Sequence, residues 1–355
     1  MADDAEDGRS VGDVWSAGGI TLSMPPSLRC FVLASLVAAS PAAAQTPDLT
    51  TRLSKTLDSL VAAGEFSGAV LLAKEGAPVF ERAYGFADRE ARTPNNVETA
   101  FNLGSINKFF TQVAIRQLAD AGKLDVDSTL ARGWPDYPNQ DVARRVTIRQ
   151  LLQHRSGVGG NIFAAPPGKT RGDIRRLQDY LPLFVNEPLQ FEPGTNQRYS
   201  NAGYVILGLL IERLSGEDYY DYVRRHIFEP AGMTRTASWT VDSLPPNTAR
   251  GYTRGDQDAP PSTPLRPNTT LLPGRGSSAG GGYSTAHDLL RLLNALRAGT
   301  IPSGPPAGIG IAGGAPGLNA ALEGDLPGGY DVIVLANLDP PAAERVARIV
   351  RAWLK

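Results

Sequence analysis

Cysteine is almost missing from this 355-residue chain, in which Cys30 is the only one. Cys30 precedes the apolar run 31–39, whereas a lipid-attachment cysteine would follow such a run, so we do not expect a lipoprotein. From Gln45 onward the sequence contains no cysteine. This absence excludes disulfides, thiolate metal sites and cysteine nucleophiles from that part of the chain.

An excess of either charge is also missing, because 35 basic residues face 36 acidic ones and leave a net charge of −1. No global field therefore favours nucleic acid or an anionic membrane, and a small-molecule or short-peptide substrate fits better. The chain has three histidines and no H-x-x-H or H-E-x-x-H pattern. We therefore expect no hydrolytic metal site and no cofactor.

A long apolar run is missing too, and this bears on the N-terminus. Residues 24–44 combine Arg29, the apolar run 31–39 and small residues at Ala42 and Ala44, which is typical of an export signal. The run is shorter than the roughly 20 residues of a permanent span. We expect residues 1–23 to be an upstream mis-start or an artificial extension. The mature chain, 45–355, is then a single periplasmic or secreted domain without a stable membrane span.

Hydrophobic periodicity predicts mixed α and β structure. A helix is expected over 49–63, followed by a hairpin of two strands, 67–76 and 77–90, that turns at Glu75 and Gly76. The tail offers strands within 317–324 and 330–338 and a helix over 342–354. Strands at both ends predict one antiparallel sheet built from the two termini and flanked by helices, which is an α/β (α+β) fold.

Between the two groups of strands the pattern is mostly helical, and we expect a helical subdomain over about 120–285. A Pro- and Gly-rich loop is expected over 245–282, and Ser284 or Thr285 would cap the helix that follows it. The helices expected after the Ser105 helix lie within 146–158, 172–186, 201–216, 217–233 and 284–299.

Ser105 and Lys108 carry the first chemical signal. Residues three apart on a helix share a face, about 5 to 6 Å between Cβ atoms, so the hydroxyl and the amine could meet. The positive end of a helix disfavours an ammonium and favours an oxyanion, so Lys108 could lose its proton and act as a base for Ser105. Alone, such a pair is in most cases a helix cap followed by a surface lysine.

Three further motifs accompany this pair in the sequence. Tyr199 and Asn201 lie two apart in "QRYSNAGY", His154 lies in "LLQHRSGV", and "IAGGAPG" occupies 311–317. With Ser105 and Lys108, these motifs resemble the serine β-lactamase and penicillin-binding protein superfamily, particularly its class C-like branch with esterases and D-amino-acid peptidases. The resemblance covers about residues 48–340 and implies a β-lactamase/transpeptidase-like fold.

The resemblance implies a role for each matching side chain. Ser105 would be the acylated nucleophile and Lys108 its hydrogen-bonded partner. Tyr199 would be a general base and acid whose phenol pKa lies well below the free value of about 10. Asn201 would hold Lys108 and a substrate amide carbonyl, and His154 would have a structural hydrogen-bonding role.

The third motif departs from the pattern of the superfamily. Relatives carry Lys-Thr-Gly or His-x-Gly on the strand that lines the site, whereas the matching positions here are expected at Ala312, Gly313 and Gly314. Gly313 and Gly314 would let a substrate approach the strand, and the N–H groups of Ser105 and Ala315 would form the oxyanion hole. The missing side chain favours esters or amides over true penicillin resistance.

Three functions stay open at this point. The first is an exported serine hydrolase that cleaves an ester or amide through an acyl-enzyme. The second is a D-amino-acid peptidase or DD-carboxypeptidase, and the third is a catalytically impaired relative that binds peptidoglycan or a partner. A Ser-His-Asp triad has no G-x-S-x-G elbow to support it. The glycine-rich stretch "RGSSAGGGYST" (275–285) is interpreted as a loop at the edge of the site, without a catalytic residue.

Overall fold

The computed structural model describes residues 41–355 apart from 256–258, 261 and 303–307. The segment 1–23 and nearly all of the predicted export signal lie outside the described residues, and residues 41–44 belong to helix α1 (Pro41–Ala62). Residues 42–355 form one compact unit. Within the described residues, every helix is too short or too polar to cross a bilayer.

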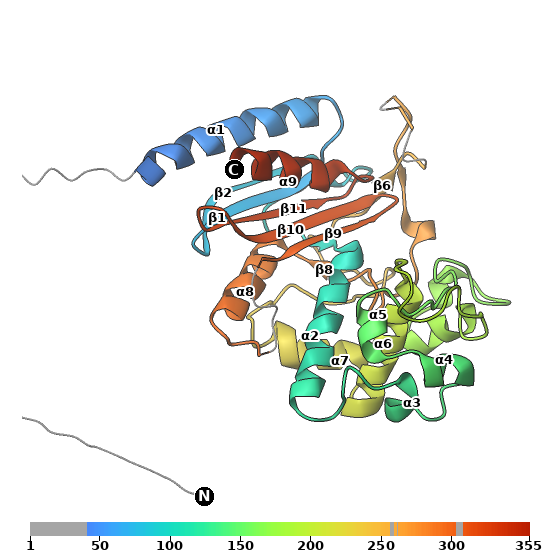
Figure 1. Ribbon diagram of the computed structural model, residues 1–355. Coiled ribbons are helices and arrows are strands. Elements are labelled where there is room, and N and C mark those ends of the chain that lie inside the picture. The colour runs from blue at the N-terminus through green and yellow to red at the C-terminus, as the bar shows by residue number, and fades with distance from the viewer. Residues whose placement is uncertain (1–40, 256–258, 261, 303–307) are drawn as a thin grey trace, which may run out of the picture. The chain divides into compact units, whose positions relative to one another are not determined.

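The chain centres on an antiparallel sheet of five strands in the order β2-β1-β11-β10-β9 (Figure 1). The two N-terminal strands join the three C-terminal ones through β1 and β11, with Gly68 opposite Ala336 and Lys74 opposite Tyr330. The prediction of one sheet built from both termini is therefore confirmed. The strands are β1 (Gly68–Lys74), β2 (Ala77–Tyr84), β9 (Gly310–Ala315), β10 (Leu318–Leu326) and β11 (Tyr330–Ala336).

Both faces of this sheet are covered. Alternate residues of β1 point to opposite sides of the sheet, and each set lies in a different hydrophobic core. Val70 and Leu72 join a core with α1 and α9 (Ala342–Trp353), which lie together on one face (Figure 1). Ala69 and Leu71 join the larger core on the other face, which includes α8 (Ala286–Arg297) and the helical region. Burial on both faces explains why β1 reads as a continuous apolar run.

The helical region between β2 and β9 contains most of the shorter elements. Its longest helices are α2 (Asn107–Asp120) and α6 (Asn201–Ser215), which pack against each other. The other elements are β3 (Phe86–Asp88), β4 (Thr93–Pro94), β5 (Phe101–Asn102), η1 (Gly104–Ile106), α3 (Leu130–Gly133), α4 (Gln140–Arg145), α5 (Ile148–Leu152), η2 (Arg171–Asp173), η3 (Leu177–Leu183), α7 (Tyr219–Val223), η4 (Arg224–Phe228), β6 (Tyr252–Thr253), β7 (Arg266–Pro267), η5 (Thr269–Leu271) and β8 (Tyr283–Ser284).

Three predicted elements differ from the structure. The helix expected over 172–186 is instead two 3₁₀ segments, η2 and η3, and Pro182 inside η3 cannot donate a backbone hydrogen bond. The helix expected over 217–233 is α7 continued by one π-helical turn, η4. The loop expected over 245–282 also contains β6, β7 and η5.

Two strand contacts place the η1 turn at the junction of the sheet and the helical region. β5 pairs with β8, so that Asn102 lies opposite Tyr283 just before the turn. The edge strand β9 packs directly against η1. The turn that carries Ser105 is thus fixed from both sides.

Candidate active site

Ser105 lies in the η1 turn, immediately before α2 begins. The turn starts with Gly104, whose φ of +50° is accessible to glycine at little cost. The N–H of Gly104 donates to Asn102 Oδ1 at 3.0 Å, and the Gly104 carbonyl accepts the N–H of Gly281 at 3.2 Å. These bonds hold Ser105 at the wall of a cavity.

Lys108 follows in the first turn of α2 and is buried, with 5% of its surface exposed. Its Nζ lies 3.1 Å from Ser105 Oγ, 2.8 Å from Asn201 Oδ1 and 2.5 Å from the carbonyl oxygen of Ala279. The contact that the S-x-x-K spacing predicted is therefore present. No carboxylate forms an ion pair with Lys108 among the described residues.

Burial lowers the pKa of Lys108 from 10.5 to about 7. A neutral lysine has two N–H donors and one lone pair. The oxygens of Asn201 and Ala279 can only accept hydrogen bonds, so they would take both N–H groups. The lone pair of Lys108 is then left to accept the hydroxyl proton of Ser105, which is the arrangement that a general base requires.

Tyr199 reaches Ser105 from the segment that precedes α6. Its hydroxyl donates to Ser105 Oγ at 2.7 Å, and its ring faces Lys108 Nζ with the centroid 4.7 Å away. Desolvation of the phenol raises the pKa of Tyr199 above its usual value of 10. The expectation of a strongly lowered phenol pKa is therefore wrong for this state, and of the two groups Lys108 is the better base.

His154 supports Tyr199 rather than reacting. Its ring stacks on that of Tyr199 with centroids 4.5 Å apart, and its Nδ1 accepts the N–H of Ser200 at 3.1 Å. Burial and the nearby Lys108 lower the pKa of His154 to about 4, so the imidazole is neutral near pH 7. The hydrogen bond agrees with the expected structural role, and the stacking adds a positioning role that the sequence did not suggest.

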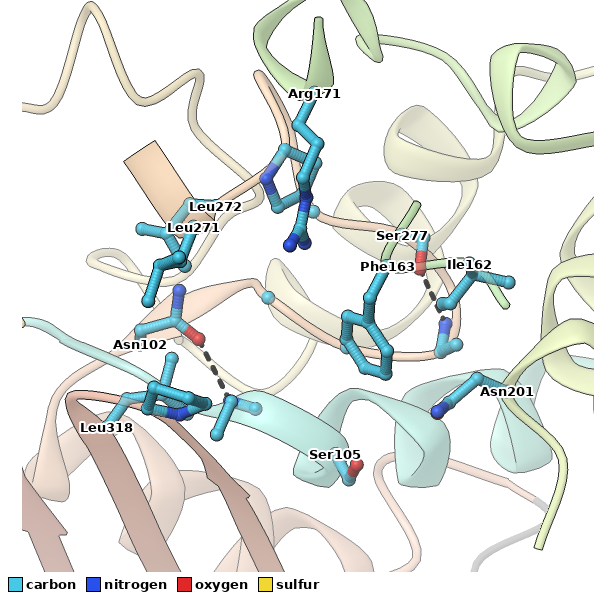
Figure 2. A pocket seen from close by; sticks show the side chains of 18 of the residues that line it. Asn102, Ser105, Ile162, Phe163, Arg171, Asn201, Leu271, Leu272, Ser277 and Leu318 are labelled. Atoms are coloured by element: carbon cyan, nitrogen blue, oxygen red, sulfur yellow. Dashed lines mark hydrogen bonds between the residues drawn. The ribbon is translucent and has the colours of Figure 1, made fainter. Parts of the chain in front are cut away.

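Asn201 is the first residue of α6, whose N-terminus is capped by the hydroxyl of Ser200. Because Asn201 Oδ1 accepts from Lys108, the amide nitrogen remains on the cavity side (Figure 2). This group can donate to a substrate carbonyl.

Strand β9 approaches the Ser105 turn so closely that one position must be glycine. A Cβ at Gly313 would lie 2.1 Å from the carbonyl oxygen of Leu103 and 2.7 Å from the N of Ser105. Side chains alternate along a strand, so Ile311 shares the face of Gly313 and Ala312 points away. The position of the missing cationic or imidazole side chain is therefore Ile311, and the expected triplet register of 312–314 is corrected to 311–313.

The same register moves the second oxyanion donor. Ala315 and Leu318 flank a two-residue turn and form its closing hydrogen-bonded pair, which directs the Ala315 N–H towards β10. Gly314, opposite Asn319, has its N–H on the free edge of β9, beside Gly104. This register favours Gly314 over the expected Ala315 as the second oxyanion donor.

The glycine-rich loop 275–285 contributes more than the sequence indicated. The Ala279 carbonyl accepts a hydrogen bond from Lys108, and the Ser278 carbonyl accepts one from Thr111 at 2.8 Å. Two backbone carbonyls carry these contacts, so a search for reactive side chains could not find them.

Ser105 lies between two cavities. The first has a volume of about 420 Å³, and its walls include Ile162, Phe163, Leu271 and Leu272 (Figure 2). The second, of about 350 Å³, is lined by Ile311 and by the side chains of Lys108, Tyr199 and His154. A substrate carbonyl at Ser105 could therefore extend a group into each. Within the described residues, no group of three or more metal-ligating side chains lies together, and we assign no metal site.

An antiparallel sheet flanked by helices, with a serine, a lysine, a tyrosine and an asparagine converging at its edge, defines the β-lactamase/transpeptidase class of fold. The chain belongs to the beta-lactamase family, whose model, described as Beta-lactamase, matches residues 53–310. The resemblance seen in the sequence is confirmed.

Individual relatives include esterases and penicillin-binding proteins. The chain is 30% identical over 329 residues to esterase EstB of Burkholderia gladioli, covering 83% of this chain and 81% of EstB. It is 31% identical over 238 residues to PbpX of Bacillus subtilis, named as a penicillin-binding protein, covering 67% and 56%. The chain spans about half the length of two of the curated relatives that it matches, and 38% of another, penicillin-binding protein 4* of Bacillus subtilis.

A solved structure shares both fold and sequence. The penicillin-binding protein from Bacillus halodurans superposes with a TM-score of 0.72 at 32% identity, covering 83% of this chain and 98% of that one. The predicted fold class is therefore confirmed.

Proposed function

We propose that this protein is an exported serine hydrolase that cleaves an ester or amide through an acyl-enzyme on Ser105. The observation that carries the proposal is the set of contacts at Lys108 Nζ, which join it to Ser105, Asn201 and Ala279. Two oxygens that can only accept hold the neutral amine, so its lone pair is directed at the hydroxyl.

The contacts support a sequence of proton transfers. Ser105 Oγ attacks the substrate carbonyl and gives its proton to Lys108. The N–H groups of Ser105 and Gly314 stabilise the oxyanion, and Tyr199 donates a proton to the leaving group and recovers one from Lys108. Water then attacks the carbonyl of the acyl-enzyme and gives its proton to Lys108. Tyr199 returns a proton to Ser105 Oγ as the carboxylic acid product leaves, and recovers one from Lys108.

Esters are favoured over penicillins as substrates. Ile311 stands where relatives carry a lysine or histidine, so the strand offers no side-chain charge to the carboxylate of a β-lactam. Similarity to EstB over 83% of the chain supports the same preference. A D-amino-acid peptidase is the second candidate, because Asn201 presents an amide that can bind a peptide carbonyl.

Export rests on the sequence alone. Residues 24–44 have the basic residue, apolar run and small residues of a signal, and we propose cleavage near Gln45. N-terminal sequencing of protein recovered from the periplasm or medium tests this proposal.

Covalent labelling tests the catalytic proposal. A fluorophosphonate or penicillin should form an adduct with the wild type at Ser105 and none with Ser105→Ala. Absence of an adduct from both reagents, in protein shown to be folded by its unfolding transition, would contradict the proposal. Initial rates on p-nitrophenyl esters, nitrocefin and D-alanyl amides then rank the substrate classes.

A further inference from the structure

The larger cavity beside Ser105 has one charged side chain in an otherwise apolar or neutral wall. Arg171 is the only ionic residue among the described residues that line it. Figure 2 shows Arg171 pointing inward from the wall opposite Ser105, with Phe163, Leu271 and Leu272 around the space between them.

Arg171 is held in place by its backbone. Its carbonyl oxygen accepts the N–H of Ile174 at 3.1 Å and that of Gly274 at 3.0 Å, which ties η2 to the segment that carries Leu271 and Leu272. A Cβ at Gly274 would lie 2.1 Å from the Gly172 carbonyl oxygen, so the two segments are in close contact. The guanidinium therefore extends from a fixed point.

The guanidinium has no acidic partner among the described residues. Its Nε is buried without a hydrogen-bond partner, and its carbon lies 5.6 Å from the centroid of the Phe163 ring. The neighbouring carboxylates are engaged elsewhere, because Asp173 accepts from Thr170 and Asp242 pairs with Arg175. Arg171 is thus a half-buried, permanently charged group without a counter-ion, and a ligand in the cavity can supply one.

We propose that Arg171 recognises a carboxylate at the far end of the substrate, and that the preferred substrates are esters or amides with an apolar segment between the scissile carbonyl and that carboxylate. This inference rests on the proposed function. A planar guanidinium binds a carboxylate through two parallel hydrogen bonds. A single cation in an apolar wall suits one negative charge better than a doubly charged phosphate.

Arg171 would thus supply, on the opposite side of the cavity, a cation that Ile311 does not provide on β9. Phe163 and Leu271, with 53% and 38% of their surfaces exposed, give the cavity an apolar mouth that fits a methylene chain. The cavity volume of about 420 Å³ limits the length of that chain.

The test compares p-nitrophenyl monoesters of glutaric, adipic and suberic acid with their neutral methyl-capped counterparts. At the best chain length, the wild type should have a kcat/KM at least about tenfold higher for the free carboxylate. Arg171→Met should abolish this ratio, a loss of about ten- to a hundredfold, expressed mainly in KM. Turnover of the neutral esters should stay within about twofold.

Arg176→Met is the matched control, because Arg176 is exposed, lies in the same segment and is not part of the cavity wall. It should keep the wild-type ratio. An unchanged ratio in Arg171→Met, or no preference in the wild type while neutral esters are hydrolysed, would overturn the role of Arg171 alone. No turnover of any ester and no label on Ser105 would overturn the proposed function, and this inference with it.

Discussion

The hydroxyl of Tyr199 donates to Ser105 Oγ at 2.7 Å, although 94 positions separate the two residues in the chain. The phenol also stacks on His154, so its position is fixed from behind. Because the pKa of Tyr199 is raised, this residue reaches the serine as a proton donor.

Tyr199→Phe removes that donor and leaves the ring in place. We expect kcat/KM for p-nitrophenyl esters to fall by on the order of a hundredfold, as for the loss of a general acid or base. The acidic limb of the pH profile should remain near 7, because it belongs to Lys108, whose pKa is about 7. Steady-state rates between pH 5 and 9 measure both the fall in kcat/KM and the position of the acidic limb. Disappearance of that limb in Tyr199→Phe would make tyrosine the base.

Burial of Lys108 should also appear in the stability of the protein. Its pKa falls from 10.5 to about 7 on folding, so between these pH values the unfolded chain binds more protons than the folded one. The free energy of unfolding therefore gains a contribution that increases with pH across this window, by about 2 kcal/mol between pH 7 and 9. Below about pH 7 both states are protonated and the contribution is constant.

Lys108→Met eliminates this titration. Urea unfolding at pH 6, 7, 8 and 9 should show the stability of the wild type increasing relative to this variant above pH 7. Lys123→Met, at an exposed position just beyond the same helix, provides the control and should track the wild type. If the stabilities of wild type and Lys108→Met changed with pH in parallel, the pKa of Lys108 would not be lowered in the folded protein.

His154 adopts a left-handed backbone, with φ of +58°, and asparagine tolerates that conformation. His154→Asn therefore keeps the backbone and removes the ring that stacks on Tyr199. We expect kcat to fall about tenfold with little change in KM, because Tyr199 is less well positioned. The limb near pH 7 should persist, since the pKa of His154 is about 4. Loss of that limb would instead assign proton transfer to the histidine.

Much of the fold could be predicted from the sequence, because strands that pair over a long range are buried and are therefore visible as apolar segments. Residues 67–76 and 330–338 are apolar enough to mark buried central strands, and the S-x-x-K spacing placed Ser105 and Lys108 on one face of a helix. The sequence offered Ser284 or Thr285 as the cap of the helix that follows, and the structure selects Thr285, whose side chain accepts the N–H of Asp288.

The errors have physical causes. Strand β9 reads "GIAGGA", with one large side chain, so no alternation in the sequence shows which residues face the site. The register of the strand favours Gly314 over the expected Ala315 as oxyanion donor. At position 279 the acceptor for Lys108 Nζ is the backbone carbonyl oxygen, which every residue type has, so the sequence does not indicate this contact. Arg171 lies in a segment with weak periodicity, and only the tertiary structure brings it to the cavity of Ser105.

The contact between β9 and the Ser105 turn allows a stringent test of the site, because two glycines of one strand differ in their surroundings. A Cβ at Gly313 would lie 2.1 Å from the Leu103 carbonyl oxygen, whereas a Cβ at Gly310 would meet no atom within 4 Å. Gly313→Ala must therefore push β9 away from η1, which separates the N–H of Gly314 from that of Ser105. Gly310→Ala adds the same methyl group to the same strand without a clash.

We expect Gly313→Ala to lower the rate of fluorophosphonate labelling at Ser105 by at least about a hundredfold, the effect of losing one oxyanion donor. Gly310→Ala should label at the wild-type rate. Thermal unfolding of both variants separates a displaced strand from a protein that has not folded, since a cooperative transition must persist for the comparison to count. Normal labelling in folded Gly313→Ala would mean that β9 does not contribute to the oxyanion hole.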